Sequence, residues 1–556
     1  MPNFCRAALL ACLLFAATAS AVPTIPAGGV VNSASFVAVG LPGDGIARGS
    51  MFAVFGIDLG PAEFTGAPSL PLGTTLGGTS ISVTVNGVTR SAFMLFSVAG
   101  QLAAVLPSDL PAGTGTLTVT YDGMASAPVV IEVVDSTFGI FTRNQAGFGP
   151  AILQNFVSQV SQPVNAITDA AHPGQVVILW GTGLGPIVGD DSNIPPVGNL
   201  PVTVEVWVGG KAAVVQYAGR SSQFPAIDQI NFVIPPGVVG CYVPVVVVVN
   251  GVASNYVSIA ITQSGAYCSD FQTFLPGELE TIVQNGQGGV GFAKLDRFRG
   301  TIETSQGSMP VLVDNAEGEF ISFTAQQIVS MTPRRDAVAP LGGCISNRGP
   351  TEGDGRVDPI QGLPLSAGSE LELVGPEGTA AVPPNGTYYE AGVGGGFGGD
   401  ALPEFYTPGT LTLRGGSPAD DIGMFEASVD LPASPQWIDQ ASFDTVRRDQ
   451  DLTIQWSGVD PDTEYVVISV QSVNNEIGVA GFIVCSVDPA AGSFTVPQRA
   501  MGTLPPSSPW DGEGDPTGVL SVSGDSRSSS GKIEATGLTT GRLYYSNRAV
   551  RTTVIE

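Results

Sequence analysis

The sequence of 556 residues is poor in the side chains that most often carry out chemistry. It contains one histidine, His172, and charged residues make up 13% of the chain, against ~25% in an average soluble protein. A single imidazole excludes a zinc site built on several histidines, and no Cys-x-x-Cys pair is present to replace them. No run of ~20 apolar residues follows the N-terminal segment, so we expect no membrane-spanning helix.

Lysine is almost absent, and the chain is strongly acidic. The lysines are Lys211, Lys294 and Lys532, and the formal net charge is −27. The phosphate backbone of nucleic acid repels such a chain, and so do anionic membrane surfaces. We therefore expect neither nucleic acid nor a membrane as a partner. The charge is typical of a soluble exported protein.

The first 21 residues have the three parts of a secretory signal peptide. Arg6 supplies the positive charge, residues 7–17 are apolar, and Ala19-Ser20-Ala21 form a small-residue cleavage site. We predict cleavage after Ala21 and a mature protein that is secreted, or held at the cell surface or in the periplasm.

Four cysteines follow the cleavage site: Cys241, Cys268, Cys344 and Cys485. An even number in an oxidising compartment favours disulfide bonds, for which four cysteines allow three arrangements. Cys241 and Cys268 are close in sequence, so we favour a bond between them, which leaves Cys344 with Cys485.

Short apolar stretches alternate with turn residues along most of the chain. The sequence has 73 glycines and 43 prolines, and helical periodicity is rare. Ile81, Val83 and Val85 alternate with polar residues as on a half-buried strand, and residues 243–249 are apolar on both faces, as in a central strand. This pattern predicts an all-β fold made of antiparallel sandwiches.

Two stretches of the N-terminal half, residues 47–61 and 172–186, repeat each other at an offset of 125 residues. The identical positions are Gly49, Gly56, Leu59, Gly60 and Pro61 in the first copy and Gly174, Gly181, Leu184, Gly185 and Pro186 in the second. His172 aligns with Ala47, so we interpret it as a turn residue and not as a catalytic one. The glycines are followed by a proline and a polar loop instead of a helix, which argues against a nucleotide-binding loop.

The stretch from Gly174 to Gly185, which reads GxxVxIxGxxLG, resembles the opening of IPT/TIG immunoglobulin-like domains. More widely, residues 28–268 resemble an uncharacterised domain family of secreted acidobacterial proteins of the Solibacter type. The motifs that carry the resemblance include GGVVNSASF, GSMFAVFGIDLGP, DQINFVIPPGVVGCYVPVVVVVNGVASN and AYCSD. The first copy departs from the pattern because it lacks a counterpart of Gln229-Ile230-Asn231. The resemblance implies tandem Ig-like domains and export, but it supplies no catalytic residues, because the family has no established activity.

These observations predict five segments: a signal peptide (1–21), Ig-like domains at 22–136 and 137–268, a β-rich domain with Gly-rich loops at 269–432, and a C-terminal β-sandwich-like domain at 433–556. In the last two domains we predict a hairpin formed by residues 406–416 and 423–432, loops at 393–400 and 523–531, and a core position for Trp456.

Few residues are candidates for catalysis. Gly524-Asp525-Ser526 matches the start of a GDS-type lipase only superficially, because no histidine follows it and no strand-to-helix turn is expected there. A glycosidase needs only two carboxylates, so it stays an alternative. We predict no catalytic residue and no cofactor other than calcium.

Acidic loops are the one feature that favours an ion, because calcium takes several oxygen ligands from a loop. The candidate ligands are Glu352, Asp354 and Asp358 in one loop, Asp511, Glu513 and Asp515 in a second, and Asp190, Asp191 and Asn193 in a third. None has EF-hand spacing, so a solvated acidic turn is the alternative for each.

The sequence therefore predicts an exported, non-enzymatic, multi-domain β protein that binds an extracellular protein or polysaccharide, as an adhesion or recognition scaffold. Two alternatives stay open. One is a secreted carbohydrate-active enzyme with Ig-like accessory modules around a catalytic region at 270–432. The other is a purely structural envelope or matrix protein.

Calcium binding would raise the melting temperature of the mature chain, residues 22–556, because a ligand that binds only the native state stabilises it by mass action. Thermal melts with calcium, and then with a chelator, measure the rise and its reversal. Asp511→Asn combined with Asp515→Asn should abolish the contribution of that loop. An unchanged melting temperature would leave the acidic loops as solvated turns.

Overall fold

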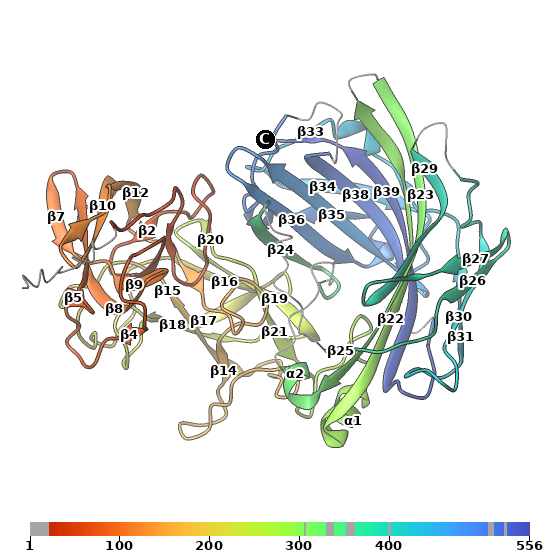
Figure 1. Ribbon diagram of the computed structural model, residues 1–556, viewed down its shortest axis with the longest axis horizontal. Helices are drawn as coiled ribbons and strands as arrows, with labels where there is room; N and C mark the ends of the chain where they lie inside the picture. Colours follow the sequence, from red (N-terminus) through yellow and green to blue (C-terminus); the bar gives the residue numbers. More distant parts are fainter. Residues whose placement is uncertain are drawn as a thin grey trace, which may run out of the picture.

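A computed structural model describes residues 22–304, 307–329, 339–351, 362–397, 402–509, 516–527 and 531–556. Strands dominate it, which confirms the predicted all-β fold class. Two sandwich domains follow each other, and a larger β unit completes the chain (Figure 1). In these residue ranges, no helix is long and apolar enough to cross a membrane.

Domain 1 consists of two sheets that enclose one apolar core. The first sheet has the order β1 (Val30–Asn32), β3 (Met51–Phe55), β9 (Gln101–Val105), β8 (Phe93–Val98) and β4 (Thr65–Gly66). The second has the order β2 (Ile46–Ala47), β12 (Val129–Val134), β10 (Gly113–Tyr121), β6 (Thr79–Val85) and β5 (Thr75–Leu76), with β7 (Val88–Ser91) and β11 (Met124–Ala125) beside it. Ile81, Val83 and Val85 of β6 are buried in the core, as their alternation predicts.

Domain 2 repeats the strand pairing of domain 1. Its strands are β13 (Gly139–Ile140), β14 (Leu153–Asn155), β15 (Val176–Thr182), β16 (Val204–Val208), β17 (Lys211–Arg220), β18 (Asp228–Val233), β19 (Gly240–Val249), β20 (Val252–Ala253) and β21 (Val257–Ile261). The antiparallel pairs β15·β18, β16·β19 and β19·β21 correspond to β3·β9, β6·β10 and β10·β12. The counterpart of β7 and β8 is the single strand β17, which pairs with both β16 and β18 and joins the two layers. The sequence repeat is therefore also a repeat of topology.

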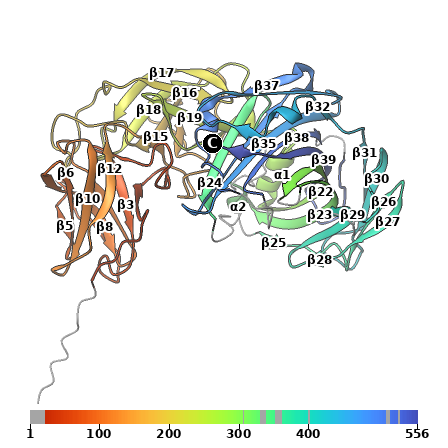
Figure 2. The same cartoon turned by 90° about the horizontal axis from the view of Figure 1, so that it is seen from above.

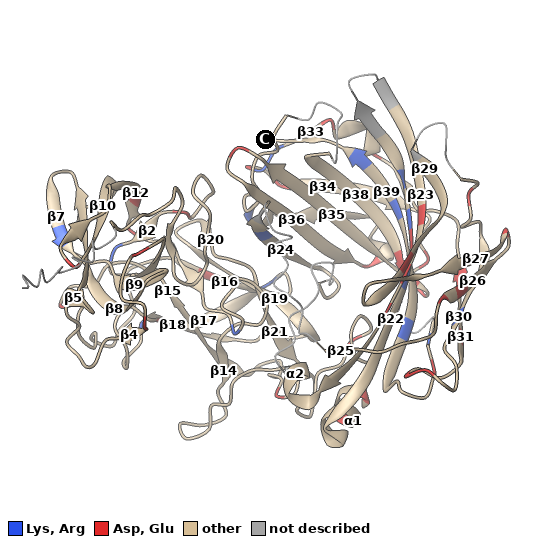
Figure 3. Cartoon of the chain, in the orientation of Figure 1, with Lys and Arg blue, Asp and Glu red and all other residues tan. Residues whose placement is uncertain are grey.

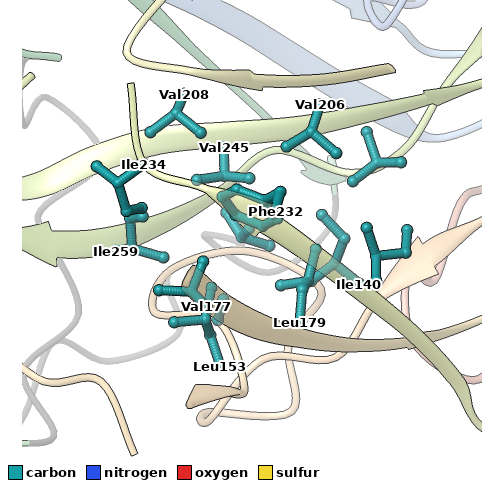
Figure 4. Packing of buried hydrophobic residues seen from close by; sticks show 14 of the residues in the cluster. Ile140, Leu153, Val177, Leu179, Val206, Val208, Phe232, Ile234, Val245 and Ile259 are labelled. Carbon is teal, nitrogen blue, oxygen red and sulfur yellow. The ribbon is translucent and has the colours of Figure 1, made fainter. Parts of the chain in front are cut away.

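Strand β19 is buried on both faces, as its uninterrupted apolar sequence predicts. Val245 and Val247 point into the core of domain 2, where Val245 packs near Phe232 (Figure 4). Val246, which points the other way, belongs to a cluster with Trp456 of the C-terminal half. The second apolar face thus holds domain 2 against the rest of the chain.

The C-terminal half is built around one large curved sheet. Among the described residues ten strands form it, in the order β24 (Gly343–Pro350), β36 (Val479–Val487), β35 (Glu464–Asn474), β38 (Gly518–Ser526), β39 (Thr540–Thr552), β22 (Gln287–Thr304), β23 (Gly307–Thr324), β29 (Tyr388–Phe397) and β28 (Pro384–Asn385), with β25 (Leu363–Pro364) beside β23. The predicted boundary at residues 432/433 is therefore wrong as a division between two separate β-domains. Parallel pairing of β22 with β39 places strands from both predicted domains in one sheet.

Two smaller sheets cover one face of the large sheet, which we call the outer face (Figure 2). The first small sheet contains β27 (Gly378–Val382), β26 (Leu371–Gly375), β30 (Gly409–Gly415) and β31 (Phe425–Leu431), and it packs against Leu295 and Tyr545. The second contains β32 (Gln436–Trp437), β34 (Leu452–Ser457) and β37 (Ser493–Val496), and it packs against Ile468 and Val522. Strands β33 (Thr445–Val446) and β40 (Val554–Ile555) form a short parallel pair.

The opposite, inner face is partly covered by two short helices and by the segment before them. These helices are α1 (Glu278–Asn285) and α2 (Ala325–Val329), whereas α3 (Gln498–Met501) packs with the second small sheet in the outer-face core. Leu279 and Ile282 of α1 pack with Val290 at the start of β22. Phe271 packs with Tyr465 and Val467 of β35. The strand positions between these two clusters carry polar side chains.

Several local predictions are confirmed and two are wrong. Strands β30 and β31 form the predicted hairpin, and Trp456 is buried in the core. The predicted loop at 393–400 is wrong for residues 393–397, which extend β29 along β23 with a register shift that accommodates the glycines. The predicted loop at 523–531 is wrong for residues 523–526, which belong to β38.

Two disulfide bonds join the expected pairs of cysteines. Cys241 is bonded to Cys268 at the end of domain 2. Cys344 is bonded to Cys485, and these residues lie opposite each other on the neighbouring strands β24 and β36.

Arg220 connects the two sandwich domains. Its guanidinium is buried, forms an ion pair with Asp228, and donates to the carbonyl oxygens of Gly49 in domain 1 (2.7 Å) and Gly185 (2.6 Å). Burial raises the pKa of Asp228 and outweighs the opposing effect of the Arg220 charge. Because one side chain binds carbonyls of both domains, it holds the start of the first repeated motif against the end of the second.

The repeated glycines allow close packing of backbone, and His172 lies in a turn. A Cβ atom at Gly181 would lie 2.3 Å from the carbonyl oxygen of Gly139, and one at the equivalent Gly56 would lie 2.2 Å from that of Thr24. The ring Nδ1 of His172 lies 3.0 Å from the carbonyl oxygen of Thr262. Both observations agree with the structural interpretation of the repeat.

Gly181→Ala should therefore destabilise the chain much more than Gly174→Ala. Gly174 has a positive φ of 85°, but a Cβ atom there would meet no other atom within 4 Å, so alanine costs only ~1–2 kcal/mol of backbone strain. Alanine at Gly181 would instead have to displace the backbone of β13, whose carbonyl oxygen at Gly139 it would meet. Denaturant unfolding of both variants measures the difference, and equal losses would contradict the close-packing interpretation.

Candidate functional site

Three rows of side chains cross the inner face at right angles to the strands. Strand register places Glu317, Lys294 and Tyr544 in the first row, Asn315, Asp296, Ser546, Asp525 and Tyr465 in the second, and Phe298, Arg548 and Ser523 in the third. Their sequence neighbours Leu295 and Tyr545 point into the outer-face core. Since side chains alternate across a sheet, the apolar outer face places these polar side chains on the inner face.

Charged groups of both signs meet at the centre of these rows. Asp296 Oδ1 lies 3.5 Å from Lys294 Nζ and 3.4 Å from an Arg548 guanidinium nitrogen. The Ser546 hydroxyl donates to Asp525 Oδ1 at 2.8 Å. Acidic and basic residues accordingly lie side by side along β22, β23 and β39 (Figure 3). We call Lys294, Asp296, Asp525, Ser546 and Arg548 the inner-face cluster.

The inner-face cluster is partly open to solvent. The side chains of Lys294, Asp296 and Arg548 are 17%, 18% and 31% exposed. A ligand can therefore reach these groups, while the surrounding sheet lowers the local dielectric and strengthens any hydrogen bond that forms.

The two carboxylates of the cluster differ in acidity. Burial alone would raise the pKa of Asp296, but the charges of Arg548 and Lys294 outweigh it and hold the pKa below its ordinary value. Burial raises the pKa of Asp525 and outweighs the hydrogen bond from Ser523 and the same two charges. Asp296 is thus the stronger acid of the two.

A second ion pair, on the outer face, shows what a purely structural arrangement looks like in this protein. Arg297 donates to both oxygens of Asp314 at 2.7 Å, and Asp314 also accepts from the backbone N–H groups of Phe405 (2.9 Å) and Tyr406 (3.0 Å). Both side chains are almost fully buried. The short bidentate contact and the two backbone N–H groups occupy both carboxylate oxygens of Asp314. The contacts of Asp296 are longer, and solvent reaches them.

Aromatic side chains border the inner-face cluster. Phe271 packs edge-on against Tyr465, with ring centroids 5.2 Å apart, and the Arg527 guanidinium lies 5.2 Å from the Phe271 ring centroid. Tyr544 and Phe298, which flank the charged groups in the first and third rows, are half-buried. The cluster therefore combines charged groups with apolar ring surfaces.

The acidic loops predicted to bind calcium do not contribute to this site. Glu352, Asp354, Asp358, Asp511, Glu513 and Asp515 lie outside the described residues. In the third loop, Asp191 accepts hydrogen bonds from the backbone (2.6 Å) and hydroxyl (2.8 Å) of Ser108, and Asp190 accepts from Ser192. Within the described ranges, no group of three or more His, Cys, Asp or Glu side chains is placed to hold a metal ion.

The inner-face cluster is not predicted by the sequence pattern. The turn signals place Asp525 in a loop, and no motif marks Asp296 or Lys294. The available signal is the alternation of charged and apolar residues in FAKLDRF, residues 292–298, which is unusual for a strand buried on one face.

No family model and no curated protein matches the chain. Solved structures resemble it weakly. The plexin A4 extracellular region is 15% identical, with 42% of this chain and 17% of that chain covered and a TM-score of 0.16. Domains 5–6 of the S-layer protein SbsC are 14% identical, with 44% and 99% covered and a TM-score of 0.17. SGBP-B, from a complex xyloglucan utilization locus in Bacteroides uniformis, is 10% identical, with 96% and 100% covered and a TM-score of 0.15. At such TM-scores none of these similarities bears on function.

Asp296→Asn should lower the free energy of unfolding by about 1–3 kcal/mol at pH 7, because it removes the carboxylate that pairs with Lys294 and Arg548. A carboxylate with a depressed native pKa contributes stability that is present above its unfolded pKa of about 4 and is lost as the pH falls through the native value. The difference between the variant and the native chain should therefore shrink as the pH falls below about 4. Denaturant unfolding at pH 7 and pH 3 measures it, with Asp430→Asn on the exposed face of β31 as the control.

Proposed function

We propose that this protein is an exported extracellular scaffold that binds a polysaccharide on the inner face of its large sheet. The observation that carries the proposal is the contrast between two sets of ionic contacts. Asp314 on the outer face is saturated by short hydrogen bonds, whereas Asp296 on the inner face has contacts of 3.4–3.5 Å and is partly exposed. A ligand hydroxyl can add hydrogen bonds at the second set without breaking a tight structural pair.

The mixture of donors and acceptors favours hydroxyl groups as ligands. Lys294 has three N–H donors and its contact with Asp296 uses one of them, while the carboxylates of Asp296 and Asp525 accept. A sugar hydroxyl donates and accepts at once, so it suits a surface where the two kinds of group alternate. A simple anion or cation would meet groups of its own sign beside those of the opposite sign.

The aromatic border supports a sugar ring in particular. The C–H faces of sugar rings are apolar, and Tyr544, Phe298 and the Phe271–Tyr465 pair supply matching ring surfaces next to the charged groups. The second row extends across five neighbouring strands, so the surface is long enough for more than one ring of a polymer.

Domains 1 and 2 would then act as a spacer that presents the large sheet. We infer that they are IPT/TIG-type domains of the acidobacterial kind, on the strength of the repeated motif and the repeated topology. Arg220, which binds carbonyl groups of both domains, supports a fixed angle between them. Adhesion to, or recognition of, an extracellular polymer is the role that such a spacer fits.

One observation favours the second candidate function, a glycoside hydrolase. Asp296 and Asp525 lie in one row, and their environments shift the two pKa values in opposite directions, as a glycosidase requires of its acid and its base or nucleophile. Against this, Ser546 interacts with both carboxylates and two cations lie beside them, so the groups already stabilise each other. We therefore favour binding without hydrolysis.

Tyr544→Ala should weaken polysaccharide binding about five- to tenfold, because a stacked or packed ring contact contributes roughly 1–1.5 kcal/mol. Affinity electrophoresis of the mature chain in gels containing neutral and acidic polysaccharides identifies the ligand and measures the loss. Tyr121→Ala, at a half-buried tyrosine of domain 1, is the matched control.

Reducing-end assays on the same polysaccharides separate the two functions. Retarded migration with no release of reducing ends supports the binding scaffold. Release that disappears in Asp525→Asn and Asp296→Asn would instead identify the hydrolase. Failure to bind any polysaccharide, or equal binding by Tyr544→Ala, would overturn the proposed function.

A further inference from the structure

A cleft lies between domain 2 and the C-terminal half. Its volume is about 160 Å³, and its walls include Trp207 and Tyr256 of domain 2 and Phe494, Pro497 and Arg499 of the C-terminal half. Trp207 lies on β16, and Arg499 lies on α3. The cleft exists only because the two parts of the chain pack against each other.

The flat face of the Arg499 guanidinium packs against an aromatic ring in this cleft. The guanidinium carbon lies 3.9 Å from the centroid of the Trp207 ring, which is a close cation–π stack. Stacking occupies the face of the guanidinium and leaves its N–H donors at the edge. The indole N–H of Trp207 donates to Glu205 at 3.2 Å, which fixes the orientation of the ring under the arginine.

No carboxylate of the described ranges forms an ion pair with Arg499. Its polar neighbour is the hydroxyl of Tyr256, whose pKa is raised by burial against the smaller opposing effect of the Arg499 charge. A guanidinium in a partly enclosed site is stabilised by an anion that its fork of donors can bind.

A second arginine approaches Tyr256 from the other side. Arg348 lines a small adjoining cavity of about 40 Å³ that also contains Tyr256 and Thr503. It donates to the carbonyl oxygen of Thr503 at 3.4 Å, and burial lowers its pKa to about 10. Two arginines therefore lie around Tyr256, and the charge of Asp44 acts on the second of them.

We propose that this interdomain cleft binds the carboxylate of a sugar acid, with Arg499 as the carboxylate-binding residue and Trp207 as its support. The planar fork of the guanidinium matches a carboxylate in a bidentate contact. The rings of Trp207, Tyr256 and Phe494 together with Pro497 provide apolar walls for the C–H face of a sugar ring. The volume limits the occupant to one ring-sized group, so a uronic acid at one position of a polymer or at its end fits. A bare inorganic anion would leave the apolar walls without a partner.

This site is separate from the inner-face cluster and does not depend on the proposed function. Long-range repulsion of an acidic ligand by the acidic chain is screened beyond ~8 Å at physiological ionic strength. Recognition would therefore rest on the local contacts of Arg499.

Titration of the mature chain with trigalacturonate, followed by tryptophan fluorescence and by calorimetry in 0.15 M NaCl, tests the proposal. Galactotriose is the neutral matched ligand, and an N-acetylated tripeptide offers a carboxylate without a sugar. We expect trigalacturonate to bind and galactotriose to bind at least tenfold more weakly. Arg499→Gln should weaken trigalacturonate binding at least tenfold, and Arg499→Lys, which keeps the charge but loses the fork, should weaken it by a smaller factor.

Control variants make each outcome decisive. Arg414→Gln, at an exposed arginine of β30, and Tyr121→Ala, at a half-buried tyrosine of domain 1, should bind trigalacturonate as the native chain does. Trp207→Phe should abolish the fluorescence change while calorimetry still detects binding. Absence of trigalacturonate binding, equal binding by Arg499→Gln with an unchanged melting temperature, or tripeptide binding in place of sugar binding would each overturn the assignment.

Discussion

Parallel pairing between β22 and β39 is the constraint on which the C-terminal half depends. Val290 lies opposite Thr540 and the register continues to Thr301 and Arg551, so segments at the two ends of this half form adjacent strands. Two adjacent parallel strands must be joined by a long crossover connection. Here the segment between β22 and β39 contains both small sheets. Because those sheets pack on one face of the large sheet, the polar side chains lie on the other face, between its two smaller apolar clusters.

The tandem N-terminal domains depend instead on close packing of backbone segments within each domain. Gly56 and Gly181 occupy equivalent positions where a carbonyl oxygen of an edge segment approaches too closely for any Cβ atom. Arg220 then binds carbonyl groups at the start of the first motif and at the end of the second. The same short motif therefore shapes each sandwich and takes part in the contact between them.

The two faces of the large sheet hold their ionic groups in different environments. Asp314, in the dry core, accepts hydrogen bonds from one arginine and two backbone groups, as a buried charge must to be tolerated. Asp296, which directly precedes Arg297 on β22, faces the other way and keeps longer, reachable contacts. A one-residue change in position thus separates a buried ion pair from a partly exposed one.

The sequence by itself determined the fold class, the tandem repeat, the buried strands such as β6 and β19, and the structural role of His172 and the repeated glycines. These features follow from residue periodicity and from contacts between near neighbours in the chain. Only the tertiary structure decided that residues 269–556 share one sheet, that residues 523–526 are a strand, and that Asp296, Asp525 and Arg548 lie together. The physical reason is that strand pairing across long separations leaves no local trace, because the hydrogen bonds that define it are made by backbone groups that every residue carries.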